Sequence, residues 1–192
     1  PSPESAIRLT LTRGPTAQRG LWSGDAPGEP TCLITVAAAG KTPPQRVIIC
    51  RATRRNEHSP LSCLKSLNYG DNILARREAI GKGASDALML NIRGDLACAT
   101  VGNVFARIDG RWITPRIADG ILPGIARAKI VRVLDVTERS IAETELMRAD
   151  AAFISNSLGC ALVRELEGRA LDGDENLLPL SIYDDKGRSA GE

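Results

Sequence analysis

The sequence predicts an α+β fold, and three observations support that prediction. Several segments are β-branched or alternate between apolar and polar side chains, which is typical of strands. Glycine-containing tight turns separate some of these segments, and apolar residues at helical spacing occur in only a few places. Because the strands come in runs and do not alternate strictly with helices, α+β is favoured over a doubly wound parallel sheet.

The expected strands are short and lie on both sides of a helical segment. Residues 6–12 alternate cleanly, and the Gly- and Pro-rich stretch that follows is expected to be a loop. The β-branched runs 32–36 and 47–50 are expected to pair with each other. The other expected strands are 87–91, 96–100, 103–108, 112–114, 151–155 and 160–166.

Helical spacing of apolar residues appears in three segments. Residues 71–82 form the clearest one, and Asp71 is expected to cap that helix. Further helices are expected from residue 123 to about residue 136 and over residues 141–149. We expect residues 1–170 to form one large domain and residues 171–192 to form a polar tail that frays or makes one weak helix.

The composition argues against several classes of function. The 192 residues are 43% hydrophobic and 25% charged with a net charge of +2, which is an ordinary globular balance and indicates neither nucleic acid nor anionic membrane as a partner. Five scattered cysteines without a Cys-x-x-Cys pair indicate neither a disulfide framework nor a zinc site, so no metal is expected. With no apolar run of membrane-spanning length and no signal-peptide pattern, the expected location is the cytoplasm.

Lys65 is the first candidate for chemistry. Its neighbours from Leu61 to Leu67 are small, apolar or neutral, so the amine is expected to lose hydration and to favour the neutral, nucleophilic form. Taken alone, Lys65 is better interpreted as a surface lysine at the end of a strand.

The second candidate is the segment Gly-Ile-Leu-Pro-Gly-Ile-Ala-Arg over residues 120–127. Glycine and proline lead there into an apolar helical pattern. A helix that begins at glycine presents free backbone N–H groups, which suit a phosphate. Taken alone, the segment is equally an ordinary helix entry with proline in its first turn.

The order and spacing of these segments resemble class IV aminotransferases, which include branched-chain and D-amino-acid aminotransferases and aminodeoxychorismate lyases. The resemblance runs over roughly residues 6–163. It rests on the lysine block through Asn68-Tyr69, then on residues 91–96, 103–105, 110, 114–115 and 120–127. It implies a fold type IV large domain with mixed, barrel-like strands and flanking helices, a pyridoxal phosphate (PLP) cofactor, an amino-acid-like substrate and a homodimer.

The resemblance also implies roles for single residues. Lys65 resembles the catalytic lysine that binds PLP covalently and can also move a proton, and Tyr69 resembles the tyrosine that contacts the cofactor's phenolic oxygen. Arg19 lies near the position at which D-amino-acid aminotransferases hold the substrate carboxylate, but the histidine of that motif is absent. The single histidine, His58, is expected to be a loop residue without a catalytic role.

The cofactor phosphate is expected at the segment that begins at Gly124. Ile125 and Ala126 resemble the pair that binds phosphate through backbone N–H groups, and Ser157 resembles a second phosphate contact. Many members have threonine at the position of Ala126, so this chain lacks one hydroxyl there.

Two further departures bear on activity. Cys98, five residues before Asn103, stands where the family usually has an acidic residue against the pyridine nitrogen. The sequence also begins about where the family's interdomain segment ends. The N-terminal small domain, with its phosphate-binding arginine, is therefore expected to be missing, either naturally or because the sequence is a fragment.

Within the family, the motifs favour the aminodeoxychorismate-lyase branch. Asn156-Ser157-Leu158, Arg54-Arg55-Asn56 and residues 59–62 look lyase-like. That reaction removes pyruvate from 4-amino-4-deoxychorismate and leaves 4-aminobenzoate for folate synthesis. Transamination of a branched-chain or D-amino acid is the alternative. A non-catalytic relic that binds or dimerises is an alternative of another class.

Overall fold

The computed structural model describes residues 5–15 and 28–183, and it divides the chain into two units, Pro1–Lys41 and Thr42–Glu192. In the first unit, β1 (Ser5–Thr12) and β2 (Thr31–Ala38) form an antiparallel pair. Ile7 lies opposite Val36 and Leu9 opposite Ile34, so apolar residues share one face. These four side chains are all more than half exposed within the described chain.

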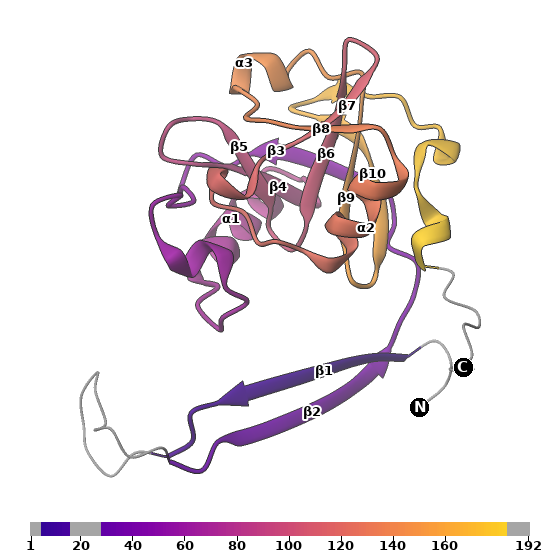
Figure 1. Ribbon diagram of the computed structural model, residues 1–192. Helices are drawn as coiled ribbons and strands as arrows, with labels where there is room; N and C mark the ends of the chain where they lie inside the picture. The colour runs from indigo at the N-terminus through magenta and orange to yellow at the C-terminus, as the bar shows by residue number, and fades with distance from the viewer. Residues whose placement is uncertain (1–4, 16–27, 184–192) are drawn as a thin grey trace. The chain divides into compact units, whose positions relative to one another are not determined.

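The described residues of the second unit form one mixed sheet of nine strands (Figure 1). Its order is β5-β4-β3-β10-β9-β6-β7-β8, and β11 pairs with β10. The strands are β3 (Gln45–Ile49), β4 (Asp86–Leu90), β5 (Leu96–Ala99), β6 (Asn103–Ile108), β7 (Arg111–Thr114), β8 (Val136–Glu138), β9 (Ala151–Asn156), β10 (Gly159–Leu166) and β11 (Arg169–Ala170). The predicted α+β fold with mixed, barrel-like strands is confirmed.

The sheet curls, so that strands far apart in its order meet again. The Ala99 N–H donates to the Gly102 carbonyl at 2.9 Å, which joins the end of β5 to the start of β6. The concave side encloses the main core, with Ile49, Leu88 and Val104 among its fully buried residues. This curl brings residues of β5, β6 and β9 to one place.

Two helices cover the outer face of the sheet. The first, α1 (Gly70–Gly81), packs Ala75 and Ala79 against a cluster that includes Met89 of β4. The second, α2 (Ile125–Val133), packs Ile130 against a cluster that includes Phe105 and Phe153, whose rings stack with centroids 4.7 Å apart. The small alanines of α1 let its backbone approach the sheet closely, so that its N-terminal end is fixed next to the segment that carries Lys65.

The remaining helices of the described chain are short. They are α3 (Glu143–Leu146) and the 3₁₀ helices η1 (Pro60–Cys63), η2 (Ile117–Asp119), η3 (Glu175–Leu177) and η4 (Leu180–Tyr183). None of the helices in residues 5–15 and 28–183 has the length and hydropathy needed to cross a lipid bilayer.

Every predicted strand is present, with ends that differ by at most two residues, but the predicted pairing of 32–36 with 47–50 is wrong. β2 pairs with β1, whereas β3 lies between β4 and β10 and is parallel to both. The continuous apolar run in β3 fits a strand between two parallel neighbours, because both of its faces are buried.

Three helix predictions need correction. α2 ends at Val133, and Val136–Glu138 form β8, because this segment begins with the β-branched Val136 and Thr137 and pairs with β7. The helix expected over 141–149 is reduced to α3. Asp71 lies in the first turn of α1, and the N-cap residue is Tyr69.

Candidate active site

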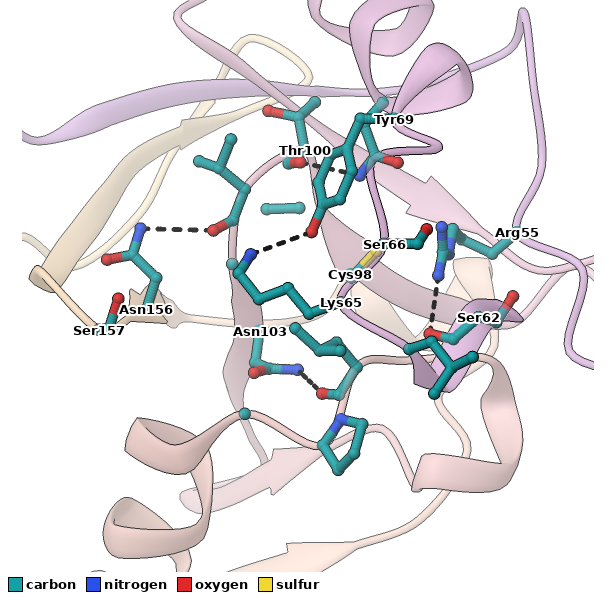
Figure 2. Close-up of a pocket in the computed structure, with 18 of the residues that line it drawn as sticks. Arg55, Ser62, Lys65, Ser66, Tyr69, Cys98, Thr100, Asn103, Asn156 and Ser157 are labelled. Atoms are coloured by element: carbon teal, nitrogen blue, oxygen red, sulfur yellow. Dashed lines mark hydrogen bonds between the residues drawn. The ribbon is translucent and has the colours of Figure 1, made fainter. Parts of the chain in front are cut away.

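A cavity of about 400 Å³ lies between the lysine segment, the β5–β6 turn and the beginning of α2. All predicted site residues in the described chain line it, namely Lys65, Tyr69, Cys98, Gly124, Ile125, Ala126 and Ser157. Figure 2 shows Lys65 reaching into the space between Tyr69, Cys98 and Ser157. Arg19, the predicted carboxylate clamp, lies outside the described residues.

Lys65 lies on the irregular segment between η1 and α1, and its ammonium group donates a hydrogen bond to the Tyr69 hydroxyl at 3.3 Å (Figure 2). The Lys65 Nζ atom is also 5.3 Å from the centroid of the Tyr69 ring. The expected loss of hydration at Lys65 is not observed; the residue is a surface lysine, as its neighbours alone suggested, but it lies on no strand. The segment runs along the cavity mouth, so Lys65 is exposed within the described residues.

Arg55 holds the lysine segment in place. Its guanidinium donates to the Ser62 carbonyl at 2.9 Å and to the Gly120 carbonyl at 3.2 Å. The Ser62 hydroxyl donates to the Asn56 carbonyl at 2.7 Å. The sequence analysis used Arg55 only as part of a lyase-like motif and missed this position. No local pattern could reveal it, because the two acceptors are 7 and 65 residues away along the chain.

Cys98, on β5, is the lining residue with the most unusual electrostatics. Its side chain is buried, and that burial raises the pKa of the Cys98 thiol to about 11, against an opposing effect of the nearby Arg55 cation. The thiol is therefore neutral near pH 7. The Asp86 carboxylate also raises the pKa of the Cys98 thiol; it accepts a hydrogen bond from Thr100 and forms an ion pair with Arg76.

The charge balance of the cavity favours anions. No aspartate or glutamate of the described chain lines it, whereas the cations of Arg55 and Lys65 do. A lining of one charge sign raises the local concentration of ligands of the opposite sign. No three or more His, Cys, Asp or Glu side chains of residues 5–15 and 28–183 are grouped so that they could hold a metal ion.

The N-terminus of α2 forms the opposite wall. Gly124 is its N-cap, no side chain of the described residues caps the helix, and the N–H groups of the first turn have no partner within the helix. A Cβ atom on Gly124 would lie 2.3 Å from Asn103 Oδ1, so the close approach of the helix to β6 requires glycine. Asn103 also fixes the entry to α2 by donating to the Leu122 carbonyl at 2.9 Å.

Two serines of the β9–β10 region lie beside this helix end. Ser155 is paired with Asn103 across the sheet, and its hydroxyl is buried without a hydrogen-bond partner in the described chain. Ser157 is exposed in the turn after β9. The turn between β5 and β6 is pressed against this strand, because a Cβ atom on Gly102 would lie 2.6 Å from the Ser155 carbonyl oxygen.

These features fit a phosphate-bearing cofactor. The beginning of α2 offers backbone donors with a partial positive charge, and Ser155, whose hydroxyl has no partner among the described residues, belongs to the same wall. An amine and a tyrosine hydroxyl face the same space. A protein-family model described as "Amino-transferase class IV" matches residues 1–166. The chain belongs to the class IV aminotransferase family.

Relatives of this class IV chain include aminotransferase-like and lyase-like proteins. It is 31% identical over 91% of its length to "Branched-chain-amino-acid aminotransferase-like protein 1" of Arabidopsis thaliana and covers 33% of that protein. The crystal structure of a "Putative 4-amino-4-deoxychorismate lyase" from Legionella pneumophila superimposes with a TM-score of 0.80 at 33% identity. That match covers 88% of this chain and 65% of the Legionella chain.

The holo form of a branched-chain aminotransferase from Thermobaculum terrenum, which contains PLP, has a TM-score of 0.74 at 27% identity. The match covers 93% of this chain and 60% of that one. Class IV aminotransferases are PLP-dependent. The present chain spans about a third of the length of its Arabidopsis relative.

Proposed function

We propose that this chain binds PLP and is the cofactor-carrying part of an aminodeoxychorismate-lyase-like enzyme. The observation that supports this most directly is the single cavity that collects Lys65, Tyr69 and the beginning of α2. These groups come from segments up to 60 residues apart and are the ones that the resemblance to class IV aminotransferases implies for the cofactor.

The bound cofactor would supply a conjugated ring that accepts electron density when a bond at the substrate's α-carbon breaks. Lys65 would hold the cofactor covalently and then move the proton, because its amine is the base that faces the cavity in the described chain. Tyr69 would orient the amine through the hydrogen bond that it accepts. The N–H groups of Ile125 and Ala126, with Ser157, would bind the phosphate.

Two observations favour the lyase over a transaminase. The lyase substrate carries two carboxylates, and the cavity is lined by cations but by no acidic side chain of the described residues. Cys98, as a neutral thiol, would not keep the pyridine nitrogen protonated. Transamination depends strongly on that protonation, whereas a lyase step that ends in an aromatic product has a driving force of its own.

Transamination of a branched-chain or D-amino acid is the second candidate, and the Arabidopsis relative is the observation that favours it. The replacement at Cys98 favours a non-catalytic relic. The hydrogen-bonded pair of Lys65 and Tyr69 opposes the relic, because a module that only binds or dimerises has no use for an amine directed into a cavity.

The test uses the purified chain and PLP. We expect a yellow complex, weak enough to be lost on dialysis, from which borohydride reduction fixes the label on Lys65 in a peptide map. Release of 4-aminobenzoate from 4-amino-4-deoxychorismate should then exceed amino transfer from branched-chain and D-amino acids. A label on another lysine contradicts the cofactor assignment. Covalent PLP with neither activity favours the relic.

A further inference from the structure

The hydroxyl of Ser155 is the unexplained polar group in the cavity wall. Ser155 is 1% exposed, and its Oγ atom is buried without a hydrogen-bond partner in residues 5–15 and 28–183. A buried hydroxyl without a partner costs free energy, and such groups are uncommon in folded proteins. Ser155 also lines the cavity, so a ligand there could supply the missing partner.

Strand register shows which face Ser155 occupies. Phe153 pairs with Phe105, and Ser155 pairs with Asn103, so these four side chains share one face of the sheet. Phe105 and Phe153 pack against Ile130 of α2. Ser155 therefore lies on the face that α2 covers, two residues along the strand from that packing.

Asn103 locates the hydroxyl relative to the beginning of the helix. A Cβ atom on Gly124 would lie 2.3 Å from Asn103 Oδ1, so the Asn103 side chain touches the N-cap of α2. Since Ser155 is the direct cross-strand neighbour of Asn103, it lies beside the same helix end. The first turn of α2 and Ser155 therefore belong to one part of the cavity lining, and the buried Ser155 hydroxyl has no hydrogen-bond partner in the described residues.

We propose that Ser155 is an additional ligand of the cofactor phosphate. Its hydroxyl donates to a phosphate oxygen at the beginning of α2 and takes the place of the hydroxyl that Ala126 lacks. The inference rests on the proposed function, because it assumes that the anion at this helix end is the phosphate of PLP. It adds a residue to the phosphate site, which otherwise consists of backbone N–H groups and Ser157.

The contrast with Ser62 separates this role from a structural one. Ser62 is also buried and lines the same cavity, but its hydroxyl donates to the Asn56 carbonyl at 2.7 Å. Removing the Ser62 hydroxyl breaks an internal hydrogen bond, whereas removing the Ser155 hydroxyl breaks none among the described residues of the ligand-free chain. Ser62→Ala is therefore the matched control for Ser155→Ala.

The experiment compares dissociation constants for PLP and for pyridoxal, which has no phosphate, by absorbance titration of the full chain. We expect Ser155→Ala to weaken PLP binding by roughly tenfold or more, the usual effect of losing a hydrogen bond to a charged group, and to leave pyridoxal binding unchanged. The melting temperature of ligand-free Ser155→Ala should equal or exceed that of the wild type. Ser62→Ala should melt earlier and keep the wild-type ratio of the two constants.

A rescue variant sharpens the test. Ala126→Thr in the Ser155→Ala background returns a hydroxyl to the first turn of α2 and should recover part of the PLP affinity. Equal weakening for PLP and pyridoxal, or no weakening, overturns the inference while the proposed function stands. A wild-type chain that binds neither compound overturns the proposed function and the inference with it.

Discussion

The two ends of the cavity are built in different ways. At the α2 end, the groups available to a ligand are mainly backbone N–H groups, placed by Gly124 and Asn103. At the β5 end, they are two side chains, the Cys98 thiol and the Arg55 guanidinium. Backbone donors persist through most side-chain substitutions, whereas a single side chain changes with one mutation. This difference fits the resemblance to the family, which implies a retained phosphate site at α2 and a replaced acidic residue at Cys98.

Lys65→Ala should have the largest effect, because the Lys65 amine would both hold the cofactor covalently and move the proton. We expect complete loss of covalent PLP, measured by absorbance and by borohydride labelling. The free energy of unfolding should change by less than about 0.5 kcal/mol, since Lys65 is exposed. Lys129→Ala, at an exposed position of α2 that does not line the cavity, is the control. A variant that keeps the absorbance of bound cofactor shows that the lysine assignment is wrong.

Gly124→Ala should damage the α2 end selectively. The new Cβ would lie 2.3 Å from Asn103 Oδ1, so either the Asn103 side chain, which fixes the entry to α2, or the beginning of the helix must move. We expect PLP affinity to fall by roughly tenfold or more, as for loss of a hydrogen bond to a charged group, with a smaller effect on pyridoxal. Gly81→Ala is the matched control, because a Cβ there meets no atom of residues 5–15 and 28–183 within 4 Å. Equal loss of PLP and pyridoxal binding would place the phosphate elsewhere.

Cys98→Glu should alter the β5 end alone. An introduced carboxylate beside the Arg55 cation would be ionised and would favour a protonated pyridine nitrogen. We expect the transamination half-reaction to rise by roughly tenfold, equivalent to ~1.4 kcal/mol, with less change in lyase turnover on the same preparation. Cys98→Ser, which stays neutral, should change neither rate by as much. An unchanged or reduced transamination rate, with PLP still bound, shows that this position does not limit the chemistry.

The smallest effect on the ligand is expected at Glu78, which anchors the loop leading to Arg55. Burial alone would raise its pKa, but hydrogen bonds from Lys82 and from the N–H groups of Ala52 and Arg51 outweigh burial and lower the pKa of Glu78 to about 2. The stabilisation is fully present above the ordinary value of 4.5 and is lost as pH falls towards 2.

The matching measurement is the free energy of unfolding of Glu78→Gln and wild type across that pH range. The gap at neutral pH should be no more than roughly 3 kcal/mol and should close on acidification. A gap that is independent of pH would mean that the Glu78 charge does not hold the loop.

Elements determined by residues close together in the sequence were predictable, whereas pairings between distant segments were not. The strand 103–108 was predicted with its observed ends, because alternation and the Asp109-Gly110 turn are local signals and both turn residues have positive φ. The neighbours of β3 were not predicted correctly, because its partner residues, 86–88 and 163–166, are distant in the sequence. Val136 was assigned to a helix because its pairing with Trp112 of β7 cannot be read from nearby residues.

In the candidate site, too, residues in short motifs were predictable and residues placed by distant neighbours were not. Lys65, Tyr69 and the beginning of α2 are carried by short motifs, so sequence order sufficed to select them, and the structure brings them to one cavity. Their roles remain predictions. Arg55 and Ser155 were missed because their positions depend on carbonyls and strand neighbours that are distant in sequence.

The close approach at Gly102 determines what can vary in this cavity. Ile154 and the Ser155 carbonyl lie so near that no side chain fits at position 102, and the turn at this contact joins Cys98 on β5 to Asn103 on β6. The separation of the two ends is thus a property of the main chain. A related protein with a longer or shorter ligand would need a different β5–β6 turn, whereas a change of ligand polarity needs only new side chains around an unchanged frame.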